Sequence, residues 1–87
     1  MQSEEVLERV RVLVETWCAR RCLRALRHIL QGFPLTSLLT DGWGEFKNAL
    51  ENVRAFARGE LGNQELETIN ELIRSIERIV NRSATQI

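Results

Sequence analysis

The chain has 87 residues, with 12 basic and 12 acidic side chains and a formal net charge of zero. Hydrophobic residues make up 44% of the chain, which is too apolar for a disordered protein. The length predicts a single domain over residues 1–87, and the balanced charge argues against a surface that is basic all round and grips nucleic acid or lipid. One proline and five glycines favour a few long helices over many short strands.

The first predicted helix spans about residues 3–31. Ser3 is a good N-cap, and the acidic residues of the next turns suit the positive end of the helix dipole. Apolar residues then recur every three or four positions, which is helical periodicity. This stripe consists of Leu7, Val10, Val14, Trp17, Cys18, Cys22, Ala25, Leu26 and Ile29, with a second edge at Val6, Leu13, Leu23 and Leu30. Gly32 is the predicted C-cap, and Pro34 prevents the helix from continuing.

The connector over residues 32–41 is unusually apolar for a loop. It contains Phe33, Leu35, Leu38 and Leu39. Because apolar loop residues are usually covered in compact proteins, the first interpretation is a plug for one end of a helical bundle. The alternative is an apolar docking surface for a partner.

Two further helices are predicted over about residues 41–58 and 63–82, with a frayed tail at 83–87. A short turn joins them, so they should form an antiparallel hairpin. The inner face of the first of these helices consists of Trp43, Phe46, Ala49, Leu50, Val53, Phe56 and Ala57. The last helix has the clearest pattern, because Leu66, Ile69, Ile73, Ile76 and Val80 follow alternating steps of three and four, as in a coiled-coil seam. Both Trp17 and Trp43 fall on inward-facing stripes and are predicted to pack in the core.

The predicted helix lengths do not match. At 1.5 Å per residue the first helix would be about 42 Å long, against about 26 and 29 Å for the other two. The hairpin therefore cannot cover the whole apolar stripe of the first helix. Three outcomes would resolve this mismatch. Either the first helix breaks near residues 19–22, or a second copy of the chain covers the excess, or a different protein covers it. Since two-fold dimers are the commonest oligomers, the prediction is an all-α three-helix bundle that forms a homodimer through the first helix.

The cysteines and the histidine do not form a recognisable reactive site. Cys18 and Cys22 lie four apart on one predicted helix, which is a poor geometry for a disulfide. Together with His28, the only histidine, they fall short of the four ligands of a structural zinc site. No motif places a nucleophile or base beside His28. The sequence therefore predicts no metal, no other cofactor and no enzymatic activity.

The expected location is a reducing cytoplasm with both thiols free. The first apolar stretch, at residues 6–14, is interrupted by Glu8, Arg9 and Arg11, which does not resemble a signal peptide. No apolar run approaches the roughly 20 residues of a membrane span. No membrane partner is expected.

Arginines are the strongest functional feature of the sequence. Arg20, Arg24 and Arg27 are spaced by four and three, so on a continuous helix they form one ridge. Three kinds of acceptor fit such a ridge. The first is acidic groups of the same chain or of an antiparallel second copy, whose Glu4, Glu5 and Glu8 carry the opposite charge. The others are a different protein and nucleic-acid phosphates.

No function follows from the sequence alone. The leading interpretation is a small, non-catalytic, cytoplasmic protein-interaction module, such as an adaptor, chaperone or regulator, that presents a helical surface. Its predicted contact residues are Trp17, Arg20, Arg24, Arg27, Phe33 and Leu35. The alternative is a nucleic-acid-binding regulator that uses the arginine ridge, although no helix-turn-helix spacing supports it.

Overall fold

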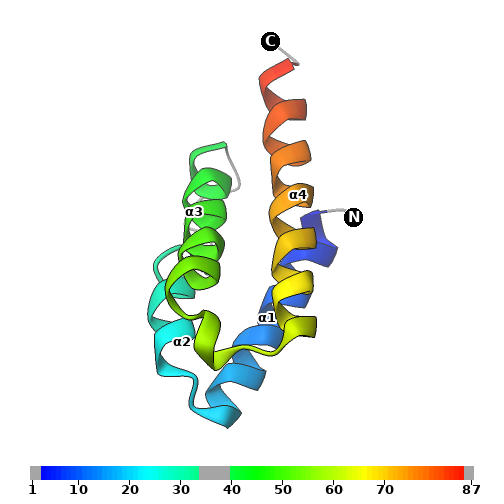
Figure 1. The fold of residues 1–87 in the computed structure, drawn as a ribbon. Helices are drawn as coiled ribbons and strands as arrows, with labels where there is room; N and C mark the ends of the chain where they lie inside the picture. Colours follow the sequence, from blue (N-terminus) through cyan, green and yellow to red (C-terminus); the bar gives the residue numbers. More distant parts are fainter. Residues whose placement is uncertain (1–2, 34–39, 86–87) are drawn as a thin grey trace.

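The computed structural model describes residues 3–33 and 40–85. These residues form four α-helices and one 3₁₀ turn, with no strand among them. The elements are α1 (Ser3–Arg20), α2 (Leu23–Ile29), α3 (Thr40–Phe56), η1 (Arg58–Glu60) and α4 (Asn63–Thr85). Successive helices run in alternating directions along the long axis (Figure 1). The prediction of an all-α protein is confirmed, whereas the prediction of three helices is wrong.

The first predicted helix is broken at Arg21 and Cys22. Arg21 has a φ of 56° and is the only non-glycine residue in the left-handed region within the described part of the chain. The backbone N–H of Cys22 donates to the carbonyl oxygen of Trp17 at 2.9 Å, and that of Arg21 donates to Cys18 at 3.2 Å. These two bonds form a Schellman motif, which ends a helix and usually has glycine at the left-handed position. Of the three solutions to the length mismatch, the structure therefore has the break.

The break changes which helices cover one another. After the turn, α2 reverses direction and packs against α3, while α1 lies along α4 (Figure 1). The 18 residues of α1 no longer exceed what the hairpin of α3 and α4 can cover. The length mismatch that led to the predicted homodimer is therefore resolved within one chain, and the homodimer itself stays a prediction.

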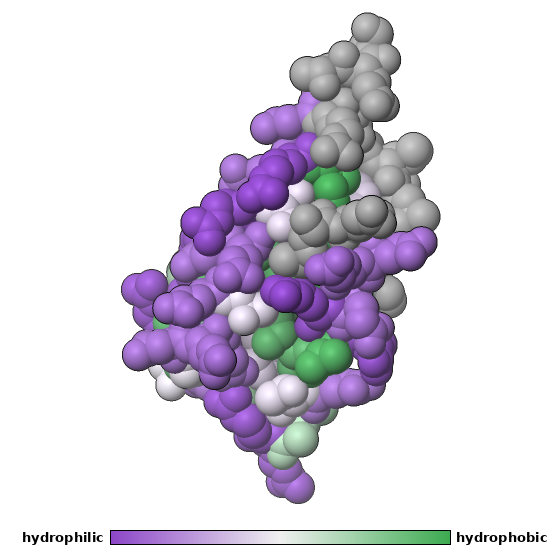
Figure 2. All heavy atoms as spheres, turned by 90° about the vertical axis from the view of Figure 1, so that its right-hand side faces the viewer, coloured by the Kyte–Doolittle hydropathy of each residue, from purple (hydrophilic) through white to green (hydrophobic). Residues whose placement is uncertain are grey.

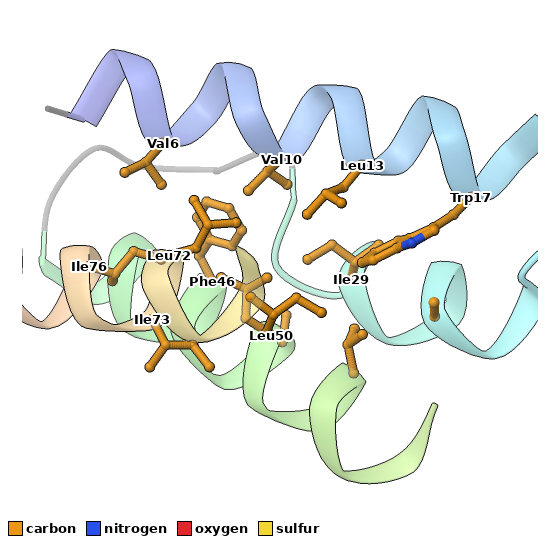
Figure 3. Packing of buried hydrophobic residues seen from close by; sticks show 14 of the residues in the cluster. Val6, Val10, Leu13, Trp17, Ile29, Phe46, Leu50, Leu72, Ile73 and Ile76 are labelled. Atoms are coloured by element: carbon orange, nitrogen blue, oxygen red, sulfur yellow. The ribbon is translucent and has the colours of Figure 1, made fainter. Parts of the chain in front are cut away.

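The buried hydrophobic residues form one core between the four helices. Figure 3 shows Val6, Val10, Leu13 and Trp17 pointing from α1 toward this core. Partners from the other helices include Ile29, Phe46, Leu50, Ile69, Leu72, Ile73 and Ile76. Trp17 and Trp43 are buried, as predicted. The seam predicted for the last helix is buried at its centre and half-buried at its ends.

Two predictions at the ends of helices are corrected. Phe56 was placed on the inner face, but α3 ends at this residue and its side chain is 63% exposed. Residues 83–85 were predicted to be a tail, but they continue α4, which projects beyond α3 and beyond the start of α1 (Figure 1). Residues 86–87 lie outside the described part of the chain, as do Leu35, Leu38 and Leu39 of the connector.

Gly32 has a different role from the one predicted. The C-cap of α2 is Leu30, with a φ of −70°. A Cβ atom on Gly32 would lie 2.8 Å from the carbonyl oxygen of Glu45 and 2.9 Å from Cα of Phe46. Both distances are shorter than ordinary van der Waals contact and involve backbone atoms. Glycine is therefore required here because the chain leaving α2 passes directly against α3.

Replacing Gly32 by alanine is expected to destabilise the protein by about 2 kcal/mol, because the backbone of α3 has to shift to admit the methyl group. Gly44→Ala is the matched control, since a Cβ at Gly44 meets no atom within 4 Å. Alanine inside a helix is favoured over glycine by about 0.5–1 kcal/mol, so Gly44→Ala should stabilise the protein. Denaturant unfolding measures both free energies, and a Gly32→Ala variant as stable as the parent protein would contradict the close packing.

Candidate functional site

The predicted contact residues are distributed between the core and the surface. Trp17 has no exposed surface, and Phe33 is half-buried with its ring 5.8 Å from that of Phe46. Arg24 and Arg27 are exposed on α2, and Leu35 lies outside the described residues. The placement of Trp17 in particular does not support a role in partner contact.

Glu65 joins the end of α1 to the start of α4. Its carboxylate accepts hydrogen bonds from the Trp17 indole Nε1 at 2.8 Å and from an Arg20 guanidinium nitrogen at 2.7 Å. It also accepts the backbone N–H of Gly62 at 3.0 Å, while the carbonyl of Gly62 accepts the N–H of Leu66. Gly62 is thus the N-cap of α4, and Glu65 supplies the reciprocal half of a capping box. Three donors from two segments converge on one side chain.

Glu60 performs a similar function for α2. Its carboxylate accepts the backbone N–H of Ala25 at 2.9 Å, in the first turn of α2, whose N-cap Cys22 makes no side-chain capping bond. Its carbonyl oxygen accepts hydrogen bonds from Arg20 at 2.8 Å and from Sγ of Cys22 at 3.7 Å. A carboxylate at a helix N-terminus both satisfies a free N–H and interacts favourably with the helix dipole. The turn η1 therefore caps α2 from outside its own helix.

The environment of Glu65 lowers the pKa of its carboxyl group from the ordinary value of 4.5. Partial burial raises the pKa and is the largest single effect. The hydrogen bonds from Arg20, Gly62 and Trp17 and the positive charge of Arg20 oppose it, and together they outweigh it. The ionised form is therefore the one that the folded structure stabilises.

The arginine ridge predicted from the sequence does not exist as one surface. Arg20 lies on α1, before the break, and is bound to Glu65 and Glu60. Arg24 and Arg27 lie on α2, after the break, and neither forms an ion pair with any of the residues that the structure describes. All three arginines are exposed, and the helix break separates Arg20, which is bound to Glu65 and Glu60, from Arg24 and Arg27.

Three large hydrophobic side chains accompany the two surface arginines. Leu23 is 69% exposed, Leu30 is 54% exposed and Phe56 is 63% exposed. In α2, positions 23, 27 and 30 share one face because they are four and three apart. The Phe56 ring lies 5.6 Å from the ring of His28 on α2, which places the end of α3 beside this helix. We refer to Leu23, Arg24, Arg27, Leu30 and Phe56 as the α2 surface.

Only some residues of the α2 surface could be recognised from the sequence. Leu23 and Leu30 belong to the second apolar edge of the predicted first helix. The buried residues of α2 are Ala25 and Ile29, and Leu23 and Leu30 point away from them and are exposed. Phe56 was missed because it continues the inward stripe of α3, and only the end of the helix at that residue exposes it.

The face on the right-hand side of Figure 1 is mainly hydrophilic, with small separate hydrophobic areas (Figure 2). Val12, at 48% exposure, is the one large hydrophobic residue of α1 that is strongly exposed within the described range. A shallow groove between α3 and α4 is lined mainly by charges of both signs, including Glu51, Arg54, Glu67 and Arg74.

The cysteines, the histidine and the acidic residues of the described ranges were candidates for metal binding or reactivity. No group of three or more His, Cys, Asp or Glu side chains among them is arranged to hold a metal ion. Cys18 is exposed, Cys22 is buried, and both thiols are free. The buried Nδ1 of His28 has no hydrogen-bond partner within this part of the chain. None of the described helices is long and apolar enough to cross a membrane.

The lowered pKa of Glu65 predicts a specific dependence of stability on pH. A carboxyl group with a lowered folded-state pKa stabilises the protein above its unfolded-state value, and this contribution disappears as the pH falls through the folded-state value. At pH 7, Glu65→Gln should therefore lower the free energy of unfolding by about 1 kcal/mol. Below about pH 4.5 the difference between the two proteins should shrink.

The measurement is urea unfolding of both proteins between pH 3 and pH 7. Glu71→Gln is the control, because the ion pair of Glu71 with Arg9 is about half exposed on both sides and such pairs contribute little. A difference between Glu65→Gln and the parent protein that stays constant over the whole pH range would contradict the assigned role of the charge.

Comparisons with protein-family models, with curated proteins and with solved structures found no match to this chain.

Proposed function

We propose that this chain is a small, non-catalytic protein-interaction module of a reducing cytoplasm, and that it binds its partner through the α2 surface. The observation that carries the proposal is that Leu23, Leu30 and Phe56 are each more than half exposed and lie on the two sides of Arg24 and Arg27. Large hydrophobic side chains that gather on a surface are typical of protein-binding sites. Aromatic and arginine residues are also enriched among those that contribute most to binding.

This surface modifies the set of contact residues predicted from the sequence. Arg24 and Arg27 are kept, and Leu23, Leu30 and Phe56 are added. Trp17 and Arg20 contribute indirectly, because their hydrogen bonds to Glu65 fix the end of α1 from which α2 departs. The position of Leu35 within the proposed surface stays a prediction.

The nucleic-acid alternative loses part of its basis. Its three-arginine ridge required a continuous helix, and Arg20 is now paired with Glu65. The remaining arginines alternate with leucines that offer nothing to a phosphate backbone. Contacts to phosphates come mainly from Arg, Lys and small polar side chains, so the α2 surface fits a protein better.

The double variant Leu23→Asp/Phe56→Ser is expected to abolish binding while leaving the fold intact. Both side chains are more than half exposed, so replacing them removes little core packing. The tagged protein is purified from the cells that produce it, the co-purifying protein is identified, and the complex is reconstituted from the two purified components. Loss of two central anchors should weaken the affinity at least about 100-fold.

Val12→Asp is the matched control, because Val12 is exposed on α1 outside the α2 surface, and it should bind as the parent protein does. Circular dichroism shows whether each variant keeps its helices. The proposal is contradicted if no protein co-purifies, or if the reconstituted complex has the same affinity with Leu23→Asp/Phe56→Ser.

A further inference from the structure

Helix α2 is positively charged, because it has basic but no acidic residues. Its sequence, from Leu23 to Ile29, contains two arginines and a histidine but no acidic residue. Elsewhere in the described residues, Arg9, Arg11, Arg20 and Lys47 each form an ion pair with a glutamate of this chain. Arg24 and Arg27 form no ion pair with a described residue, which is also true of Arg21, Arg54, Arg58, Arg74 and Arg78. What distinguishes α2 is that it contains no acidic residue, whereas every other described helix does. The α2 surface therefore keeps two positive charges that the rest of the described structure leaves uncompensated.

A second copy of the chain is a poor occupant for this surface. A two-fold interface brings the same patch of both subunits together. If the α2 surface lay at its centre, Arg24 and Arg27 of one copy would face those of the other. Like charges brought together at an interface are unfavourable and act against that partner. The charges instead select a partner that carries carboxylates.

The spacing of the hydrophobic residues indicates the shape of that partner. Leu23 and Leu30 are seven residues apart, which corresponds to about 10 Å along a helix. A second helix with apolar residues at positions i, i+3 or i+4 and i+7 presents its side chains with the same period. Phe56, at the end of α3, lies beside His28. Position 28 points about 140° away from position 23 around a helix, so Arg24 and Arg27 lie between Phe56 and the two leucines.

We infer that the α2 surface recognises an acidic amphipathic helix of another protein. The apolar residues of that helix pack on Leu23 and Leu30, and the carboxylates on its flank pair with Arg24 and Arg27. This inference rests on the proposed function and adds the class of partner to it.

The inference is tested with designed helical peptides of about 20 residues. One peptide has leucines at the i, i+3, i+4 and i+7 positions, flanked by glutamates. A second has the same leucines flanked by lysines. A third has the amino-acid composition of the first in a scrambled order, which removes the apolar face. Fluorescence anisotropy gives the affinity of each peptide for the full chain at low and at high salt.

The glutamate peptide is expected to bind at least about tenfold more tightly than either of the others, with an affinity that falls as salt is added. Arg24→Glu/Arg27→Glu should reverse the preference toward the lysine peptide. Arg58→Glu is the control, since Arg58 is exposed on η1 and outside the α2 surface, and it should keep the preference. Equal binding of the glutamate and lysine peptides, or no binding of any peptide, would overturn the inference.

Other occupants of the α2 surface would give different results in further measurements on the same variants. Self-association of the chain in sedimentation, lost in Leu23→Asp/Phe56→Ser, would identify a second copy and overturn the inference. Binding of a double-stranded DNA or RNA oligonucleotide that is lost in Arg24→Glu/Arg27→Glu, without peptide binding, would identify a nucleic acid instead. If the reconstituted natural complex depends on Leu23 and Phe56 but tolerates Arg24→Glu/Arg27→Glu, the acidic partner is refuted and the proposed function stands.

Discussion

The arrangement of the helices depends on two carboxylates, that of Glu60 in η1 and that of Glu65 in the first turn of α4. Glu60 caps the first turn of α2 through the Ala25 N–H, and Glu65 receives Trp17 and Arg20 from the end of α1. A helix of 7 residues is too short to be stable by itself in water. The left-handed residue at the break, Arg21, adds a local cost that glycine would not have. Contacts with distant parts of the chain therefore hold α2 in place.

This arrangement has a consequence for the surface of the protein. A continuous helix would have placed three arginines in one row, whereas after the break Arg20 is bound to Glu65 and to the Glu60 carbonyl, and Arg24 and Arg27 form no ion pair with a described residue. Leu23 and Leu30, beside these two arginines, are more than half exposed. Ala25 and Ile29 are buried in the core, so the apolar stripe of the predicted first helix still packs inward after the break. The candidate binding surface is thus a product of the same contacts that fix α2.

The parts of this fold that local patterns determine were predictable, and the parts that depend on distant contacts were not. The periodicity of α4 and the inward stripe of α1 follow from spacing alone, so Trp17, Ile69 and Ile76 were placed correctly. The break could be expected only from the mismatch in helix length, because Arg21 is not a residue that normally ends a helix. Glu60 and Glu65 were unremarkable in sequence, since their partners lie 35 to 48 positions away. The exposure of Phe56 depends on where α3 ends, and helix ends are the least predictable feature of a pattern.

The most direct test of this account is amide hydrogen exchange in Glu60→Ala. If the Glu60 carboxylate holds α2, its removal should raise the exchange rates of the α2 amides about tenfold, as expected for local opening of a short element. The amides of α3 and α4 should change little. Glu71→Ala, which removes an exposed ion pair with Arg9, should leave α2 as it is in the parent protein. Unchanged protection of α2 in Glu60→Ala, or an equal loss of protection in all four helices, would contradict the account.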